Sequence, residues 1–245
     1  ILETLAAGGS DWTPRELADT VGCTQGPITT LRKKGLIISS SRRVRSVSHA
    51  IPKEEKEQNL VLNTDQQRAL HSINEVVDRG EYQGFLMHGI TGSGKTEVYI
   101  RAIQKAVEFG RQAIVLVPEI SLTPQLSQKF IDTFGSKVGL WHSKLTQREK
   151  YKTWQGLHDN KYSIIIGARS AIFTPISNLG LIIVDEEHDP SYKQESSSFK
   201  YHARDVGMIR AKYSNSTILL GSATPSVESF FDVLCTMMIG GGTSP

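Results

Sequence analysis

The sequence predicts an α/β protein in which helices cover both faces of a parallel sheet, preceded by a small helix-turn-helix domain. Two observations support this fold class. Short runs of Val, Ile and Leu alternate with amphipathic segments over most of the chain, which is typical of strands buried on both faces. The chain also has 245 residues, enough for two unequal domains at roughly 150 residues per domain.

A polar stretch marks the expected boundary between the domains. Residues 53–60 are rich in Lys, Glu and Gln, so we expect a solvated linker there. The expected order is a winged-helix domain at 1–52, the linker, the α/β domain at 61–234 and an atypical tail at 235–245. Because the chain begins with Ile1 instead of Met, we also expect a fragment of a longer protein.

Composition excludes several classes of protein. At 38% hydrophobic and 22% charged residues, the chain lies far from the range of disordered proteins. No segment approaches the ~20 apolar residues that a membrane span needs, so we expect a cytoplasmic protein without a membrane partner. Two cysteines exclude a disulfide framework and a four-cysteine zinc site, and a net charge of +3 permits a polyanionic partner.

Helix start and stop signals organise the first fifty residues. Thr13 and Pro14 predict a helix start, Gly22 predicts its end, and Thr24 predicts a second start. Two short helices joined by a tight turn are typical of a helix-turn-helix, and the alternation over 37–47 favours a wing.

The same region is basic, because no Asp or Glu lies between Thr20 and Pro52. We expect its cations to bind DNA phosphates. The alternative interpretation is a small helical cap with a solvated basic face. The candidate residues are Arg32, Lys33, Lys34, Arg42 and Arg43.

The second domain is predicted from its apolar runs. Between them we expect helices that extend through Val107 and Phe134 and a further helix near Tyr151. A ligand site is expected where the strands end, at the carboxyl edge of the sheet. The expected strands cover 84–88, 113–117, 138–141, 163–166, 181–184 and 217–220.

The strongest motif is G-x-x-x-x-G-K-[ST] at 89–96, between an expected strand and an expected helix. Glycines let backbone N–H groups turn toward phosphate oxygens, and the helix N-terminus adds its positive dipole end. Lys95 is expected to reach the β- and γ-phosphates and Thr96 to ligate Mg²⁺. The other expected phosphate-binding residues are Gly89, Thr91, Gly92, Ser93 and Gly94.

A second motif delivers carboxylates to the end of the strand 181–184. Asp185 is expected to hold Mg²⁺, directly or through water, and Glu186 to orient and deprotonate the water that attacks the γ-phosphate. These residues, with Lys95 and Thr96, form the expected catalytic set. Since no separate phosphate-acceptor site is evident, a nucleotide hydrolase is favoured over a kinase.

At this point the motifs resemble a known family. Residues 185–188, Asp-Glu-Glu-His, resemble the DExH box of superfamily 2 helicases, and 221–225, Gly-Ser-Ala-Thr-Pro, are similar to their motif III. The run from Leu62 to about Val233 resembles the PriA family, the bacterial primosomal protein N′ helicases of replication restart. The resemblance implies a RecA-like first helicase lobe, preceded by that family's winged-helix domain.

The resemblance also implies residue roles. Gln66 would read the adenine edge, which favours ATP. Motif III would link the nucleotide state to the grip on DNA, and the residues concerned are His188, Ser222, Ala223 and Thr224. Backbone-contacting segments and an aromatic-rich loop would hold single-stranded DNA, and their residues are Pro118, Arg169, Ser170, Tyr192, Phe199 and Tyr201.

The implied activity is ATP-dependent 3′-to-5′ translocation on single-stranded and forked DNA, with primosome proteins and single-strand-binding protein as partners near the nucleoid. The second lobe, the zinc-binding insert and the domain for the 3′ end are absent from this chain, so we expect it to be weak or inactive alone. Two alternatives remain: another superfamily 2 DNA translocase, or a winged-helix DNA-binding or partner-docking module with an inactive nucleotide lobe.

Overall fold

The computed structural model describes residues 2–7, 14–37, 61–90, 92–122, 124–195, 199–232 and 235–238. The chain divides into two compact units, Ile1–Asn59 and Leu60–Pro245. The expected linker and nearly all of the expected wing lie outside the described residues, so the winged-helix prediction is not confirmed. No described helix has the length and apolar character needed to cross a membrane.

The described residues of the first unit form three short helices, α1 (Leu2–Ala7), α2 (Pro14–Val21) and α3 (Gln25–Lys33). Gly22 has φ +64°, a left-handed conformation that ends α2 as the sequence predicts. Leu17 and Ala18 on α2 and Ile28 on α3 form a small buried cluster. The two helices therefore pack against each other through one apolar face each, as in a helix-turn-helix.

The second unit is built on a seven-stranded sheet in the order β3-β4-β2-β5-β8-β1-β9, and each pair of neighbouring strands in it is parallel. The parallel sheet predicted from the sequence is confirmed. Its strands are β1 (Gln83–His88), β2 (Gln112–Leu116), β3 (Val138–Trp141), β4 (Ile164–Gly167), β5 (Leu179–Asp185), β8 (Thr217–Ser222) and β9 (Cys235–Met238).

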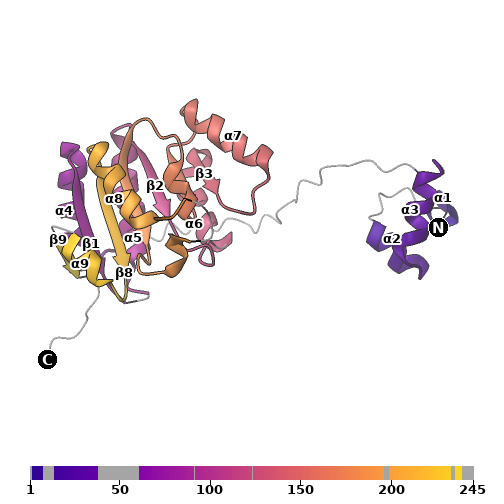
Figure 1. The fold of residues 1–245 in the computed structure, drawn as a ribbon, viewed down its shortest axis with the longest axis horizontal. Helices are drawn as coiled ribbons and strands as arrows, with labels where there is room; N and C mark the ends of the chain where they lie inside the picture. Colours follow the sequence, from indigo (N-terminus) through magenta and orange to yellow (C-terminus); the bar gives the residue numbers. More distant parts are fainter. Residues whose placement is uncertain are drawn as a thin grey trace. The chain divides into compact units, whose positions relative to one another are not determined.

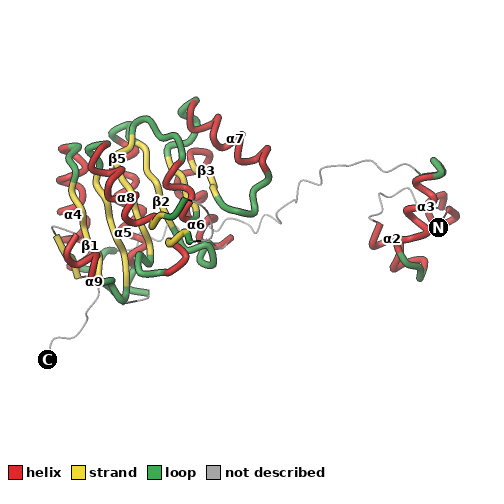
Figure 2. Tube along the Cα trace, in the orientation of Figure 1, coloured by secondary structure: helices red, strands yellow, loops and turns green. Residues whose placement is uncertain are grey.

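Helices lie on both sides of these strands (Figures 1 and 2). The long connections run through helices because parallel strands need crossovers. A separate antiparallel hairpin joins β6 (Lys193–Gln194) to β7 (Tyr201–His202). The helices are α4 (Thr64–Arg79), α5 (Lys95–Glu108), α6 (Pro124–Phe134), α7 (Gln147–His158), α8 (Ala203–Tyr213) and α9 (Val227–Asp232), with short 3₁₀ turns η1 (Gly135–Lys137), η2 (Arg169–Phe173) and η3 (Pro190–Tyr192).

Successive residues of the central strands pack into two different cores. On β1, Phe85 and Met87 join the core beneath α4 and α5, whereas Leu86 joins the core beneath α8. This alternation follows from the two-residue period of a strand, and it explains why the strands are continuous apolar runs.

The sequence analysis did not assign the edge strand β9, which lies at the start of the expected atypical tail. Its residues Cys235–Met238 pair in parallel with β1 in the register Phe85↔Cys235. The physical reason is that β1 would otherwise expose one side of its backbone at the sheet edge.

We predict that truncating a central strand side chain destabilises the second unit strongly. Ile114→Ala removes a fully buried side chain in the middle of β2 and should lower the free energy of unfolding by about 2–5 kcal/mol. Ile209→Ala, at a 58% exposed site on α8, is the control and should change it by about 0.5 kcal/mol or less. Urea titration followed by circular dichroism compares the two, and equal losses would contradict the assigned core.

Candidate active site

The loop between β1 and α5 has the backbone conformation of a phosphate-binding loop. Gly92 and Gly94 both have φ +82°, in the left-handed region that strongly favours glycine. The amide of Gly89 donates to the carbonyl of Ser222 at 3.0 Å, which ties the loop to the end of β8. Thr91, another expected phosphate-binding residue, lies outside the described residues.

Lys95 is the first residue of α5 and is only 7% exposed. Its ammonium donates to the carbonyl of Gly89 at 2.7 Å and lies 3.7 Å from Oε1 of Glu186. The two motifs found in the sequence are therefore brought together across the carboxyl edge of the sheet. A buried ammonium in a loop of this kind is suited to bind phosphate oxygens.

The environment of Ser93 indicates whether this loop fits a phosphate ligand. Its hydroxyl is buried and has no hydrogen-bond partner among the described residues, although buried hydroxyls are normally paired. Together with the helix N-terminus and Lys95, this unpaired donor fits a bound phosphate group. Thr96 follows on the first turn of α5, half-buried, as the motif requires for a hydroxyl ligand to Mg²⁺.

Asp185 ends β5, and its Oδ1 accepts a hydrogen bond from the hydroxyl of Tyr99 at 2.9 Å. Burial raises the pKa of Asp185, and the charge of Glu186 adds to this rise, whereas the Tyr99 bond and Lys95 oppose it. Glu186 has φ +47°, unusual for a residue with a side chain. Its second oxygen lies 3.7 Å from Nδ1 of His188.

The four residues expected to couple the motifs lie close together. A 2.7 Å hydrogen bond joins Nδ1 of His188 to Oγ of Ser222, and the same hydroxyl accepts from the amide of Thr224 at 3.1 Å. The carbonyl of Ala223 accepts from Nε2 of His88 at 3.1 Å. The end of β5 and the segment after β8 are thus directly connected.

Gln66 lies at the start of α4, against the phosphate-binding loop. It forms a capping box with Asn63, and its Nε2 donates to the carbonyl of Ser93 at 2.7 Å. Both ends of the carboxamide therefore bond to protein groups in this structure. The structure places Gln66 beside the loop, and its expected role in reading adenine stays a prediction.

Sequence reasoning missed a buried polar cluster around Glu187. This side chain is fully buried and accepts from the amide of Ser226 at 2.8 Å and the hydroxyl of Ser229 at 2.7 Å. Arg204, at the start of α8, lies 3.4 Å away and is 7% exposed. The third acidic residue of the Asp-Glu-Glu-His motif is the signal that could have indicated it, because a buried carboxylate needs such partners.

Arg204 remains charged in this environment. Burial lowers its pKa, but hydrogen bonds and charges from Asp205 and Glu187 raise it by more, so the net direction is upward. The cluster therefore holds an ion pair that is shielded from water.

Some expected DNA-contacting residues have other roles. Nη1 of Arg169 donates to the carbonyls of Ser191 and Lys193, each at 3.0 Å, so it supports the β6 end of the hairpin. Ser170 is exposed beside it, as a DNA contact requires. The side chain of Pro118 is buried, and the expected contact of its segment with a DNA backbone stays a prediction.

The aromatic residues divide into a buried and an exposed set. Tyr192 is fully buried and donates to the carbonyl of Asp185 at 2.5 Å, so its assignment as a base-stacking residue is wrong. Phe199 is 64% exposed and lies 5.7 Å from Tyr201 between ring centroids. Phe173, which the sequence analysis missed, is exposed and completes the aromatic cluster, with its ring centroid 4.9 Å from that of the half-buried Tyr201.

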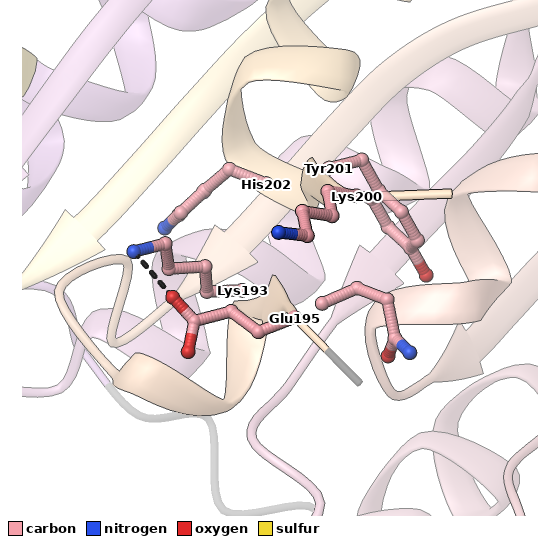
Figure 3. Close-up of a pocket in the computed structure, with 6 residues that line it drawn as sticks. Lys193, Glu195, Lys200, Tyr201 and His202 are labelled. Atoms are coloured by element: carbon pink, nitrogen blue, oxygen red, sulfur yellow. Dashed lines mark ion pairs between the residues drawn. The ribbon is translucent and has the colours of Figure 1, made fainter. Parts of the chain in front are cut away.

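A cavity of about 630 Å³ adjoins this cluster at the hairpin (Figure 3). The nitrogen atoms of Lys193, Lys200 and His202 point to the left of that view, whereas the Tyr201 ring points to the right. Lys193 pairs with Glu195 at 2.6 Å. Burial lowers the pKa of His202. The lining residues are Lys193, Gln194, Glu195, Lys200, Tyr201 and His202.

The basic candidates of the first unit are exposed at the end of α3. Arg32 and Lys33 lie in its last turn and Lys34 follows it. Arg42 and Arg43 fall outside the described residues. No group of three or more His, Cys, Asp or Glu residues in the described part of the chain could hold a metal ion.

Comparison with known proteins gives consistent matches. A family model described as DEAD/DEAH box helicase matches residues 63–233. The replication restart protein PriA of Bacillus subtilis is 45% identical over 88% of this chain and 27% of its own length. PriA of Chlamydia pneumoniae is 42% identical over 89% of this chain and 29% of its own length. The chain therefore spans less than a third of these relatives.

Solved structures share the fold. RecG bound to a three-way DNA junction has a TM-score of 0.57 and 26% identity over 75% of this chain and 25% of the RecG chain. The Hef helicase domain of Pyrococcus furiosus has a TM-score of 0.53 and 15% identity, over 73% of this chain and 38% of its own, which shows the fold alone. The resemblance to the PriA family that the motifs indicate is confirmed.

We predict that removing Arg204 destabilises the second unit. Arg204→Met leaves the Glu187 carboxylate buried without its cation, which should cost about 3–5 kcal/mol of unfolding free energy. Urea titration measures this loss. Arg68→Met, which breaks an exposed pair with Asp65, is the control and should leave the midpoint nearly unchanged.

If the ion pair is the cause, the double variant Glu187→Gln/Arg204→Met should lose less stability than the sum of its single variants. Additive losses would contradict a direct interaction between the two side chains.

Proposed function

Because the chain belongs to the DEAD/DEAH box helicase family, we propose that its second unit binds ATP and Mg²⁺ as the first lobe of a replication-restart DNA helicase. The observation that carries the proposal is the position of Lys95, between the loop carbonyl of Gly89 and the carboxylate of Glu186. The similarity to PriA supports the replication-restart role.

Each part of the site has a chemical task under this proposal. The loop amides and Lys95 bind the phosphates, and the unpaired hydroxyl of Ser93 gains a partner there. Thr96 and Asp185 would hold Mg²⁺, which when bound neutralises developing phosphate charge. Glu186 would orient the attacking water and accept its proton, and Gln66 would read the adenine edge of the base.

The proposed polymer substrate is single-stranded or forked DNA. The exposed rings of Phe173 and Phe199 and the half-buried ring of Tyr201 offer faces on which unstacked bases can stack, and neighbouring lysines can meet phosphates. RecG, which has 26% identity to this chain, is solved on a three-way DNA junction. We propose 3′-to-5′ movement, a cytoplasmic, nucleoid-associated location, and primosome and single-strand-binding proteins as partners.

Hydrolysis by this chain alone is expected to be slow. Phosphoryl transfer relies on cations that surround the γ-phosphate, and helicases of superfamily 2 complete that set from a second lobe. This chain spans less than a third of its PriA relatives. We therefore propose that its measurable properties are nucleotide and DNA binding.

The second candidate function is a DNA-binding module whose nucleotide lobe is inactive. It is favoured by the exposed cations at the end of α3, on a unit with a helix-turn-helix core. The two candidates make different predictions for nucleotide binding.

We predict that nucleotide binding requires Lys95. Lys95→Ala removes the buried ammonium and should abolish saturable binding of a fluorescent ATP analogue with Mg²⁺, measured by anisotropy with and without single-stranded DNA. Lys137→Ala, an exposed lysine just before β3 at the opposite edge of the sheet, is the control and should bind as the unchanged chain does. A folded chain that binds no nucleotide would favour the DNA-binding module.

We predict that the α3 cations determine the salt dependence of DNA affinity. The triple variant Arg32→Gln/Lys33→Gln/Lys34→Gln should flatten the slope of log affinity against log salt on single-stranded DNA, by about 0.7 for each phosphate that the chain no longer neutralises. Anisotropy titrations over a range of salt concentrations measure the slope. An unchanged slope would make this basic face a solvated surface.

A further inference from the structure

Tyr99 is a buried polar residue that the motifs do not explain. It lies one turn after Lys95 on α5, is 1% exposed, and donates its hydroxyl to Oδ1 of Asp185 at 2.9 Å. A tyrosine that only fills a core needs no carboxylate partner. Its hydroxyl here ends at one oxygen of the carboxylate that is proposed to hold Mg²⁺.

Gly221 makes this contact possible. It pairs with Asp185 in the register of β5 and β8. A Cβ atom at Gly221 would lie 1.7 Å from the Tyr99 hydroxyl and 2.9 Å from the ring carbon that carries it. Because the φ of Gly221 is not in the left-handed region, the requirement for glycine is steric, and the phenol occupies the space of the missing side chain.

We infer that Tyr99 is a positioning residue that orients the Asp185 carboxylate for Mg²⁺, with Gly221 providing the space for it. The hydroxyl donates to Oδ1, which together with a backbone hydrogen bond from Glu186 restricts the rotation of the carboxylate, and Oδ2 receives no hydrogen bond from Tyr99. This inference rests on the proposed function, because it assigns a partner to the same metal site.

The magnitude follows from general behaviour of metal sites. Groups that hydrogen-bond to a metal ligand fix its orientation, and removing them typically costs about 10- to 100-fold in metal affinity. In the described part of the structure, no recorded hydrogen bond joins Tyr99 to the phosphate-binding loop. Removing its hydroxyl should therefore weaken Mg²⁺ affinity and leave nucleotide affinity in the absence of metal unchanged.

The test compares Tyr99→Phe with the unchanged chain by titrating a fluorescent ATP analogue in EDTA and then titrating Mg²⁺ at fixed nucleotide. We expect equal nucleotide affinity in EDTA and a Mg²⁺ half-saturation point raised by about 10- to 100-fold. Tyr162→Phe is the matched control, because Tyr162 lies just before the amino end of β4 and Asp185 lies at the carboxyl end of β5, and both titrations should stay unchanged.

A second variant tests the same contact from the other side. Gly221→Ala should displace the phenol and raise the Mg²⁺ half-saturation point in the same direction. The double variant Tyr99→Phe/Gly221→Ala should lose less Mg²⁺ affinity than the two single losses combined, because both changes break one hydrogen bond. Thermal melting establishes that each variant is folded.

The outcomes are distinct. A folded Tyr99→Phe chain with an unchanged Mg²⁺ requirement, or with an equal loss of affinity in EDTA, would overturn the positioning role and leave the proposed function intact. If the chain without any substitution binds no nucleotide, that result would overturn the proposed function and this inference with it.

Discussion

Burial of charge at the carboxyl edge of the sheet is the constraint on which the rest of the site depends. Lys95 and Arg204 are each 7% exposed and Glu187 is fully buried. An isolated charge in such a place costs several kcal/mol, so each needs a partner from another segment. Those partners come from the loop after β1, the end of β5, the start of α8 and the segment after β8. Pairing the charges therefore fixes how these segments are placed.

The same pairing connects the aromatic hairpin to the proposed nucleotide site. Arg204 comes two residues after β7, and it contacts Glu187, which also binds Ser226 and Ser229. One residue beyond Glu187, His188 is hydrogen-bonded to Ser222 on β8. If the hairpin shifted alone, the buried side chains of Arg204 and Glu187 would lose their partners, which costs free energy. The end of β5 and the segment after β8 must therefore shift together with the hairpin.

The sequence predicted the strands and the motif loop because both depend on local signals. Apolar runs located β3 with the same bounds, and the glycine pattern located the loop before α5. Tyr192 could not be placed in this way. A tyrosine with a polar tip suits both a base-stacking surface and a core, and only the carbonyl of Asp185 within reach of its hydroxyl decides between them. Phe173 was missed because it meets Tyr201 through the fold, far away in sequence.

Lys95 also indicates how the site can change partners. Besides a longer hydrogen bond to the carbonyl of Ile90 at 3.4 Å, its ammonium donates at 2.7 Å to the neutral carbonyl of Gly89, whereas Glu186 at 3.7 Å is beyond hydrogen-bond distance. Under the proposed function, Lys95 exchanges that carbonyl for a phosphate oxygen, which is the stronger acceptor because the bond is charge-assisted. Glu186 then shares the Lys95 ammonium with the phosphate, and its other oxygen stays 3.7 Å from Nδ1 of His188. His188 in turn bonds to Ser222. The Glu186 carboxylate therefore links the binding partner of Lys95 to the position of the segment after β8.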